Sequence, residues 1–381
     1  MKVVIASDSY KESLKAIEVC EAIERGFAAV FPKAEYVKVP IGDGGEGTVE
    51  SLVGATMGGI ISLNVTGPLG ESVQAYYGMS KDKETAFIDM AAASGLQHVP
   101  IEKRNPLITT TKGTGELILH ALDQGAKHII LGLGGSATND GGAGMLSALG
   151  VEFINRKGEV IEPSGGTLHL ITALNLSRMD TRLKDIKLEA ACDVDNPLVG
   201  PKGASFVFGR QKGANVEMMK ELDGNLKHYA NILKQYVSFD VSLIPGAGAA
   251  GGMGAAVVAV LKGQLRKGIE IVLDYTNFDK CIEGADLIVT GEGRIDEQTA
   301  YGKAPVGVAK RAKCRHIPVI AIGGSVSPNY TIVYEKGIDA VFSITASPMT
   351  LEEAYKRAEE NIEMTARNIA AVWKLASEKR F

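Results

Sequence analysis

The sequence contains no apolar run that spans a membrane and very little cysteine. Its longest apolar runs, such as residues 255–261, fall far short of the roughly 18–20 residues that a membrane-spanning helix needs. The apolar stretch near the N-terminus, residues 3–6, is too short for the core of a signal peptide, so we expect a cytoplasmic protein. The 4 cysteines show neither Cys-x-x-Cys nor Cys/His spacing, which favours reduced thiols over a disulfide framework or a zinc site.

Positive charge is scarce too, and the most familiar phosphate-binding loop is missing. With 41 Lys and Arg against 45 Asp and Glu, the formal net charge is −4, which excludes a protein that holds nucleic acid through a general basic surface. A Walker-type loop is excluded because the single Gly-Lys pair, at 302–303, is followed by Ala304 instead of serine or threonine. We therefore expect small-molecule partners, with no nucleic acid and no membrane.

Glycine, by contrast, is abundant. The 45 glycines make up about 12% of the 381 residues, against an average of about 7%. No Gly-X-Y repeat accounts for them, so they should gather in particular loops. The length predicts two or three domains, and a hydrophobic content of 45% suffices for more than one core.

Both ends of the chain alternate between strand-like and helix-like patterns. Short apolar runs indicate buried strands at 2–6, 35–41, 286–291, 317–324 and 338–344. Ser9 with Glu12, and Thr350 with Glu353, have the spacing of a capping box ahead of a helical pattern. Strands that alternate with helices are typical of a parallel sheet covered on both faces.

The middle of the chain begins differently. Residues 61–90 hold three strand-like runs without a helix between them, and a turn at 67–70 joins the first two. Successive hairpin strands do not belong in a purely parallel sheet. We therefore predict an α/β protein of two domains. A doubly wound, flavodoxin- or Rossmann-like parallel-sheet domain from 1–62 plus 285–381 is interrupted by a mixed α/β domain of 63–284.

Three segments match or extend the G-x-G-x-x-G/A pattern, at 42–47, 132–137 and 246–251. Three matches in one glycine-rich chain show that the pattern alone is weak evidence. The residues inside each loop must therefore indicate what that loop binds. The segment 134–144 is the best phosphate cradle, because it follows a buried strand, leads into a helix and carries hydroxyl donors. The residues expected to bind the nucleotide there are Gly134, Gly135, Ser136, Thr138, Asp140, Gly141 and Gly142.

Alternatives stay open for these loops. Asp140, the single acid of 134–144, suits a magnesium ion or a ribose hydroxyl better than bare phosphate. The whole loop also suits a tight turn that packs a helix on a sheet. The loop that starts at 246 carries no charge, and its small residues, Gly248 among them, suit close approach to an anion or to another helix.

The glycine loops at 42–47 and 291–296 contain carboxylates. Asp43 and Glu46 would repel an unaccompanied pyrophosphate, and they suit hydroxyl binding, a metal or general-base chemistry. The segment 291–296 repeats the theme after another strand, with Arg294 as a bidentate donor for a carboxylate or phosphate. A solvated turn is the alternative for either loop. Lys303, at the start of a helix, is the best single candidate for a phosphate-binding lysine.

Asp193 and Asp195 stand two positions apart after an apolar run. On a strand, that spacing directs both carboxylates to one face. Two like charges on one face cost free energy unless a cation or a proton lies between them. The pair therefore predicts a magnesium site or a base with its orienting partner, with surface exposure as the alternative.

Taken together, these segments resemble the bacterial glycerate kinase family. GGSATNDGGAGM (134–145) and CDVDNPL (192–198) are far more specific than any glycine pattern. The resembling segments run across most of the chain in the family's order: 7–27, 40–52, 113–125, 130–150, 191–214, 244–256 and 286–310. Arg210 stands where the family usually has proline, and Gly42 stands where alanine is common. Neither departure removes a candidate catalytic group.

The resemblance implies phosphorylation of D-glycerate that depends on ATP and Mg2+, with the 2-position favoured. It also implies an active site in the cleft between the two domains. Asp193 and Asp195 would hold magnesium, or one of them would take the hydroxyl proton. Arg294 would bind the glycerate carboxylate, and Asp43 or Asp296 would bind its hydroxyls or act as base. The catalytic residues expected are Asp43, Asp193, Asp195, Arg294, Asp296 and Lys303.

A nicotinamide-dependent dehydrogenase of a small hydroxy acid and a non-catalytic small-ligand sensor are the alternatives. Only the uncharged loop from 246 fits the dinucleotide fingerprint, and the acid about 20 residues on, Glu270, precedes a strand instead of ending one. The density of acid and hydroxyl groups in the glycine loops speaks against a pure sensor. The oligomeric state stays open, with a homo-oligomer among the options.

Overall fold

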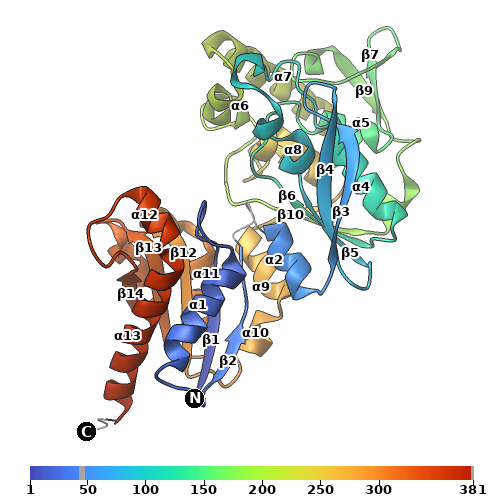
Figure 1. Ribbon diagram of the computed structural model, residues 1–381. Helices are drawn as coiled ribbons and strands as arrows, with labels where there is room; N and C mark the ends of the chain where they lie inside the picture. The colour runs from blue at the N-terminus through green and yellow to red at the C-terminus, as the bar shows by residue number, and fades with distance from the viewer. Residues whose placement is uncertain (43–47, 379–381) are drawn as a thin grey trace. The chain divides into compact units, whose positions relative to one another are not determined.

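The computed structural model describes residues 1–42 and 48–378 and is a mixed α/β structure (Figure 1). The chain divides into two compact units: a terminal unit, Met1–Ala55 with Ile269–Phe381, and a central unit, Thr56–Gly268. The α/β fold class is confirmed, while the domain division at 62/63 and 284/285 stays a prediction. Within the described residues, no helix is both long and apolar enough to cross a membrane.

The terminal unit contains a parallel sheet of five strands built from both ends of the chain. The strand order is β14-β13-β12-β1-β2 and every pair is parallel. The strands are β1 (Lys2–Ser7), β2 (Glu35–Lys38), β12 (Leu287–Ile295), β13 (Val319–Val326) and β14 (Ala340–Ser343). Each strand overlaps one of the five apolar runs of the sequence. β1, β12 and β13, in the middle of the sheet, are largely buried, and such strands need side chains that are apolar on both faces.

Helices cover this sheet. They are α1 (Ala16–Ala28), α2 (Thr48–Ala55), α9 (Gly268–Tyr275), α10 (Phe278–Cys281), α11 (Ala304–Lys313), α12 (Leu351–Lys356) and α13 (Ala358–Glu378). The first and last long helices, α1 and α13, lie side by side (Figure 1). A Cβ atom on Gly26 of α1 would lie 2.4 Å from the carbonyl oxygen of Glu363, so glycine permits this close helix packing.

The two predicted capping boxes have different outcomes. Thr350 and Glu353 form the box that opens α12. The box at Ser9 and Glu12 is wrong, because Glu12 has a positive φ of 63° and α1 begins only at Ala16.

The central unit contains a mixed sheet of six strands in the order β11-β10-β6-β5-β4-β3. The strands are β3 (Gly59–Thr66), β4 (Ser72–Met79), β5 (Thr85–Asp89), β6 (His128–Gly132), β10 (Lys187–Ala191) and β11 (Gln264–Arg266). β3, β4 and β5 pair antiparallel, which confirms the three strand-like runs in 61–90, and the other pairs are parallel. A small sheet of β7 (Glu152–Asn155), β8 (Val160–Ile161) and β9 (Ile171–Asn175) is separate.

The central unit also contains helices. They are α3 (Ala91–Ser94), α4 (Lys112–Asp123), α5 (Ala143–Ala148), α6 (Ala204–Phe208), α7 (Val216–Leu233) and α8 (Ala249–Ala259), with short 3-10 turns that include η5 (Arg210–Lys212). In the sheet register, Asp89, Gly132 and Ala191 stand side by side at the carboxyl ends of β5, β6 and β10. The loops that follow these three strands therefore start at one edge, where open α/β sheets bind their ligands.

Candidate functional site

The loop after β6 presents an exposed glycine turn. Gly134 and Gly135 are exposed, whereas residues 136–144 are buried or nearly so. Gly135 has a φ of +67°, a conformation that glycine adopts without strain. Within residues 1–42 and 48–378, no acceptor lies within hydrogen-bond distance of the backbone N–H groups of these two glycines. Free, exposed N–H groups at a strand's carboxyl end are suited to binding an anion.

The rest of this loop is held from inside by Asp140. Its buried carboxylate accepts hydrogen bonds from the N–H of Thr111 (2.8 Å) and the hydroxyl of Thr111 (2.7 Å). It also accepts from the N–H groups of Gly142 (3.1 Å) and Gly144 (3.2 Å). Burial raises the pKa of Asp140, although these donors act in the opposite direction. The expectation that Asp140 and Gly142 face the nucleotide therefore needs correction: the carboxylate caps the start of α5 and shapes the loop.

The glycines of this loop and of the loop from 246 bring two backbones together. A Cβ atom on Gly251 would lie 2.0 Å from the carbonyl oxygen of Thr138, and one on Gly141 would lie 2.7 Å from the ring of Tyr229. Gly248 likewise faces the carbonyl oxygen of Pro197 at 2.3 Å. These contacts favour the packing alternative for Gly141 and Gly248, because the absent side chains make room for protein instead of leaving space for phosphate.

A buried lysine that the sequence analysis did not single out supports the exposed turn. Lys212, at the end of η5, is 2% exposed. Its ammonium group donates to the hydroxyl oxygen of Ser136 (2.7 Å) and to the carbonyl oxygen of Thr138 (2.6 Å). Burial lowers the pKa of Lys212 to about 7, and the charge of Asp140 opposes that shift. Arg210, which the sequence analysis noted two residues earlier, is exposed.

Further polar groups are buried behind the turn. Within the described part of the chain, Thr138 Oγ1, Asn139 Oδ1 and the Tyr229 hydroxyl are buried without a hydrogen-bond partner. The amide nitrogen of Asn139 donates to Ser205 (3.0 Å). Buried polar atoms in native proteins are rarely left unpaired, so this interior has the polar character that ordered water or a ligand satisfies.

Asp193 and Asp195 follow β10 in a loop instead of lying on the strand. β10 ends at Ala191, so the argument that both carboxylates share one strand face is wrong. Both side chains are exposed, and Asp193 accepts a hydrogen bond from the N–H of Gly268 at 3.1 Å. No group of three or more His, Cys, Asp or Glu side chains suited to a metal ion occurs in residues 1–42 and 48–378.

In the terminal unit, the end of β12 carries Arg294. Its guanidinium donates two hydrogen bonds to the hydroxyl of Ser327, at 3.1 and 3.0 Å, and its Nε lies 3.4 Å from a carboxylate oxygen of Asp296. The Arg294 side chain is 67% exposed, so most of the guanidinium is accessible to a ligand. Asp296 also accepts from the N–H of Gln298 (2.8 Å) and so caps the 3-10 turn η7 (Glu297–Tyr301).

Glu292, a carboxylate on β12 itself, is paired with Lys303. The ammonium of Lys303 lies 3.8 Å from Glu292 Oε2, and the Glu292 side chain is only 8% exposed. Thr299 donates to the other carboxylate oxygen of Glu292. Lys303 precedes α11, as the sequence indicated, but it faces a carboxylate that the sequence analysis did not select. Asp43 and Glu46 lie outside the described residues.

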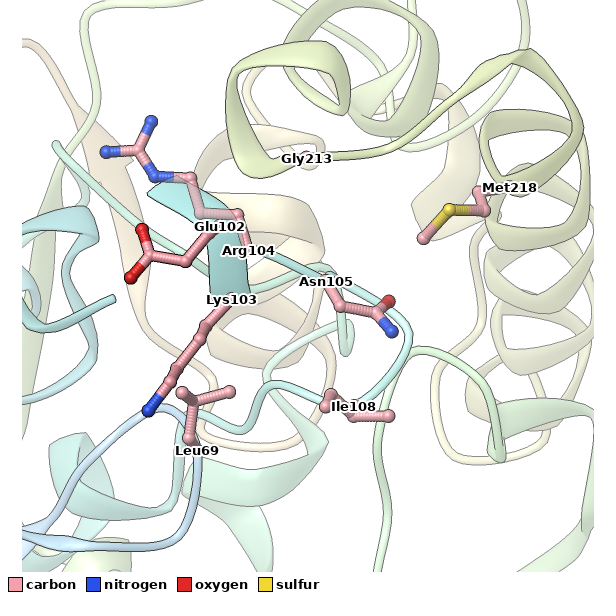
Figure 2. A pocket seen from close by; sticks show the side chains of 8 residues that line it. All are labelled: Leu69, Glu102, Lys103, Arg104, Asn105, Ile108, Gly213 and Met218. Carbon is pink, nitrogen blue, oxygen red and sulfur yellow. The ribbon is translucent and has the colours of Figure 1, made fainter. Parts of the chain in front are cut away.

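The central unit has a pocket of about 600 Å³. Its lining residues are Leu69, Glu102, Lys103, Arg104, Asn105, Ile108, Gly213 and Met218. Figure 2 shows Asn105, Ile108 and Met218 around one space, with Gly213 above it. None of the sequence-predicted site residues lines this pocket, because its walls come from segments without chemical motifs.

Two walls of the pocket adjoin residues that hold the loop after β6. Gly213 directly follows Lys212, and Ile108 directly precedes Thr109, whose hydroxyl donates to the carbonyl oxygen of Ala137 (3.0 Å). Residues that directly neighbour two pocket-lining positions therefore hold the loop after β6.

Comparisons with known proteins agree with one another. The model of the glycerate kinase family matches residues 3–374. A glycerate kinase of Bacillus cereus is 85% identical over 381 residues, which is 100% of both chains. The glycerate 2-kinase of Escherichia coli is 56% identical over 371 residues, 97% of each chain. The crystal structure of a Salmonella typhimurium LT2 protein assigned as glycerate kinase 2 has a TM-score of 0.91 at 53% identity and covers 99% of both chains.

Proposed function

The chain belongs to the glycerate kinase family, and from that premise we infer that it transfers the γ-phosphoryl group of ATP to a hydroxyl of D-glycerate. The family resemblance predicted from the sequence is confirmed, and the dehydrogenase and sensor alternatives find no support in the comparisons. The observation on the structure that carries the proposal is the exposed turn of Gly134 and Gly135, whose N–H groups have no acceptor within the described residues.

In the central unit, this turn receives phosphate oxygens of ATP. Backbone N–H groups bind phosphate without introducing a competing charge, and the glycines let the ligand approach closely. Ser136 adds a hydroxyl next to the turn. Phosphoryl transfer needs mainly positioning and neutralisation of charge, and a rigid set of donors supplies the positioning.

The exposed carboxylates of Asp193 and Asp195 are the groups we propose for magnesium. Mg²⁺ is commonly held by one or two carboxylates together with substrate phosphates and water, so a pair of exposed carboxylates fits this ion without a larger cluster. When bound, the ion would neutralise charge on the phosphates. Asp193 also anchors the backbone at Gly268, which fixes the loop in place.

In the terminal unit, Arg294 is the group we propose for the glycerate carboxylate. Its planar guanidinium matches a carboxylate in geometry, and Ser327 and Asp296 hold it in one orientation. In the reaction, the glycerate hydroxyl oxygen attacks the γ-phosphorus and the bond from that phosphorus to ADP breaks. The hydroxyl proton passes to a carboxylate, for which Asp43, Asp193 and Asp296 are the candidates.

The pocket lined by Ile108, Gly213 and Met218 is where we propose that the nucleoside of ATP binds. Its volume of about 600 Å³ falls in the range of pockets for drug-sized ligands. Ile108 and Met218 provide apolar contact for a flat base, and the Asn105 amide nitrogen provides a donor. Lining residues Ile108 and Gly213 directly neighbour residues that hold the loop after β6, and this supports a ligand with a base at one end and phosphates at the other.

Phosphorus NMR on the purified protein with ATP, magnesium and D-glycerate tests the proposed reaction. We expect a new phosphomonoester signal that is absent without D-glycerate. Coupling of this signal to one proton places the phosphate on C2, which the name of the E. coli relative favours, and coupling to a methylene places it on C3. If ATP binds but no ester forms, the acceptor is a different alcohol and the proposal is wrong.

A further inference from the structure

Lys212 is an unusual lysine, because its charged end is enclosed by protein. Lysine side chains are almost never fully buried unless they are paired, yet Lys212 is 2% exposed. No carboxylate lies within 4.0 Å of its ammonium nitrogen in residues 1–42 and 48–378. The carboxylate that acts on it from a greater distance is Asp140. A positive charge is therefore held in the interior without a direct counter-ion from the described residues.

The ammonium group has more hydrogen-bonding capacity than its protein partners use. It carries three N–H donors, and two of them reach Ser136 Oγ and the carbonyl oxygen of Thr138. Both partners belong to the loop whose exposed end is the Gly134–Gly135 turn. Burying an ammonium costs free energy, and an anion bound nearby offsets that cost.

Lys212 is one of several groups whose hydrogen bonds hold the segment around that turn. On one side, Leu96 N–H donates to the carbonyl oxygen of Gly135 (3.0 Å) and Ala137 N–H donates to the carbonyl oxygen of Ser94 (2.9 Å). On the other side, Lys212 holds the Ser136 hydroxyl oxygen. Because this oxygen accepts from Lys212, its own proton is left to donate to another acceptor.

We propose that Lys212 is a positioning residue of the ATP phosphate site: it orients the Ser136 hydroxyl and the N–H groups of Gly134 and Gly135, and it supplies buried positive charge behind them. This proposal rests on the proposed function, in which the turn receives the phosphates. Lys212 acts through Ser136 and the loop backbone, since its ammonium group is too deeply buried to be the phosphate's main contact. A nearby phosphate in turn stabilises the charged form of the lysine.

The test separates ATP from glycerate with four single variants. Lys212→Met removes the charge at similar length, Lys212→Arg keeps the charge, Ser136→Ala removes the linking hydroxyl, and Lys220→Met removes an exposed lysine of α7 as a control. ATP affinity is measured by calorimetry without glycerate, and KM is measured for both substrates.

We expect Lys212→Met to weaken ATP binding at least tenfold and to change the KM for glycerate less than twofold. Lys212→Arg should recover part of the loss, and Lys220→Met should behave as the wild type. Ser136→Ala should also weaken ATP binding. A double variant with Lys212→Met and Ser136→Ala should lose less ATP affinity than the product of the two single losses, because both substitutions act through one contact.

Unchanged ATP affinity in a folded Lys212→Met variant overturns the proposal, and so does an equal rise of both KM values. If Lys212→Met does not fold, Ser136→Ala decides, since it leaves the buried charge in place; full ATP affinity in this variant also overturns the proposal. Failure of the proposed function is seen in the wild-type protein and not in the variants: the wild type would then bind ATP without phosphorylating glycerate. In that case the effect of Lys212 on ATP affinity still stands.

Discussion

At the scale of single residues, two buried ionisable side chains organise the loop after β6. Asp140 draws the N–H groups of Gly142 and Gly144 inward, and Lys212 draws Ser136 and Thr138 inward from the other side. Within residues 134–144, Gly134 and Gly135 are the two that stay exposed. The glycine-rich sequence suggests many phosphate donors in this loop, whereas the hydrogen bonds of the structure leave this turn as the candidate.

The buried ammonium predicts a pH-dependent contribution to stability. In the unfolded chain a lysine has its ordinary pKa of 10.5, whereas burial lowers the pKa of Lys212 to about 7 in the folded chain. Between these values the unfolded state binds the extra proton, so the stability of the wild type should rise with pH relative to Lys212→Met. The gain is at most about 1.4 kcal/mol per pH unit. Urea unfolding of both proteins at pH 7, 8 and 9 measures it, and a constant difference would contradict the prediction.

Arg294 predicts a selective effect on the second substrate. Replacing it by alanine removes a bidentate partner for a carboxylate, so the KM for glycerate should rise by about tenfold or more, the equivalent of roughly 1.4 kcal/mol or more. Arg294→Lys should recover only part, because an ammonium lacks the planar fork. ATP affinity, measured separately by calorimetry, should stay within twofold of the wild type. A loss of ATP affinity alone would refute the role given to Arg294.

Residue type and spacing did not single out Lys212, although it lies in the resembling segment 191–214. It is one of 41 basic residues. Burial is decided by what packs around η5, including Ser136 and Thr138, which lie more than 70 positions away. Arg294, in contrast, was selected from the sequence, because the end of a parallel strand is where ligands bind in open α/β sheets, and its role stays a prediction.

At the scale of elements, most of the predicted strands are confirmed, whereas the predicted chemistry of the loops stays a prediction. Apolar runs identify β1, β12 and β13 because parallel strands bury both faces. The strand assigned to Asp193 and Asp195 fails because β10 stops at Ala191, and periodicity gives little information on where a strand ends.

The contact between the loop after β6 and α8 makes Gly251 sensitive to substitution. An alanine there would have a φ of +67° and a Cβ atom 2.0 Å from the carbonyl oxygen of Thr138. We expect Gly251→Ala to lower the free energy of unfolding by about 2–4 kcal/mol. Gly224→Ala on α7 is the matched control, because nothing lies within 4 Å of the new Cβ atom. This substitution should raise the free energy of unfolding by about 0.5–1 kcal/mol. Urea denaturation compares them; equal stabilities would refute the packing argument.

The pocket predicts a second effect on ATP. Ile108→Asp replaces an apolar wall by a carboxylate, so the KM for ATP should rise about tenfold, the equivalent of roughly 1.4 kcal/mol. Ile108 is 59% exposed, which lets the variant fold. Ile101→Asp is the matched control, because Ile101 is an exposed isoleucine of the same segment that does not line the pocket. If the two variants have equal KM values for ATP, the nucleoside binds elsewhere.

At the scale of the whole molecule, the central unit is one continuous segment with its own sheet and core, whereas the terminal unit is made of two pieces. Our prediction is that residues 56–268, produced alone, fold cooperatively and bind ATP but do not phosphorylate glycerate. Thermal unfolding with and without ATP and magnesium measures both properties. A fragment that stays unfolded would show that the central unit does not fold independently of the terminal unit.

The construction of the terminal sheet also sets an order of assembly during synthesis. β1 leaves the ribosome long before β12, its partner on one side, in which Leu287 pairs with Val3. At about 5–20 residues per second, the N-terminal strand waits on the order of 15–60 seconds for that partner, and the central segment is complete earlier. Until then the largely apolar β1 can pair only with β2, and its other edge stays open. An exposed strand edge of this kind favours binding to chaperones, so a shortage of chaperones should reduce the yield of this protein more than its final stability suggests.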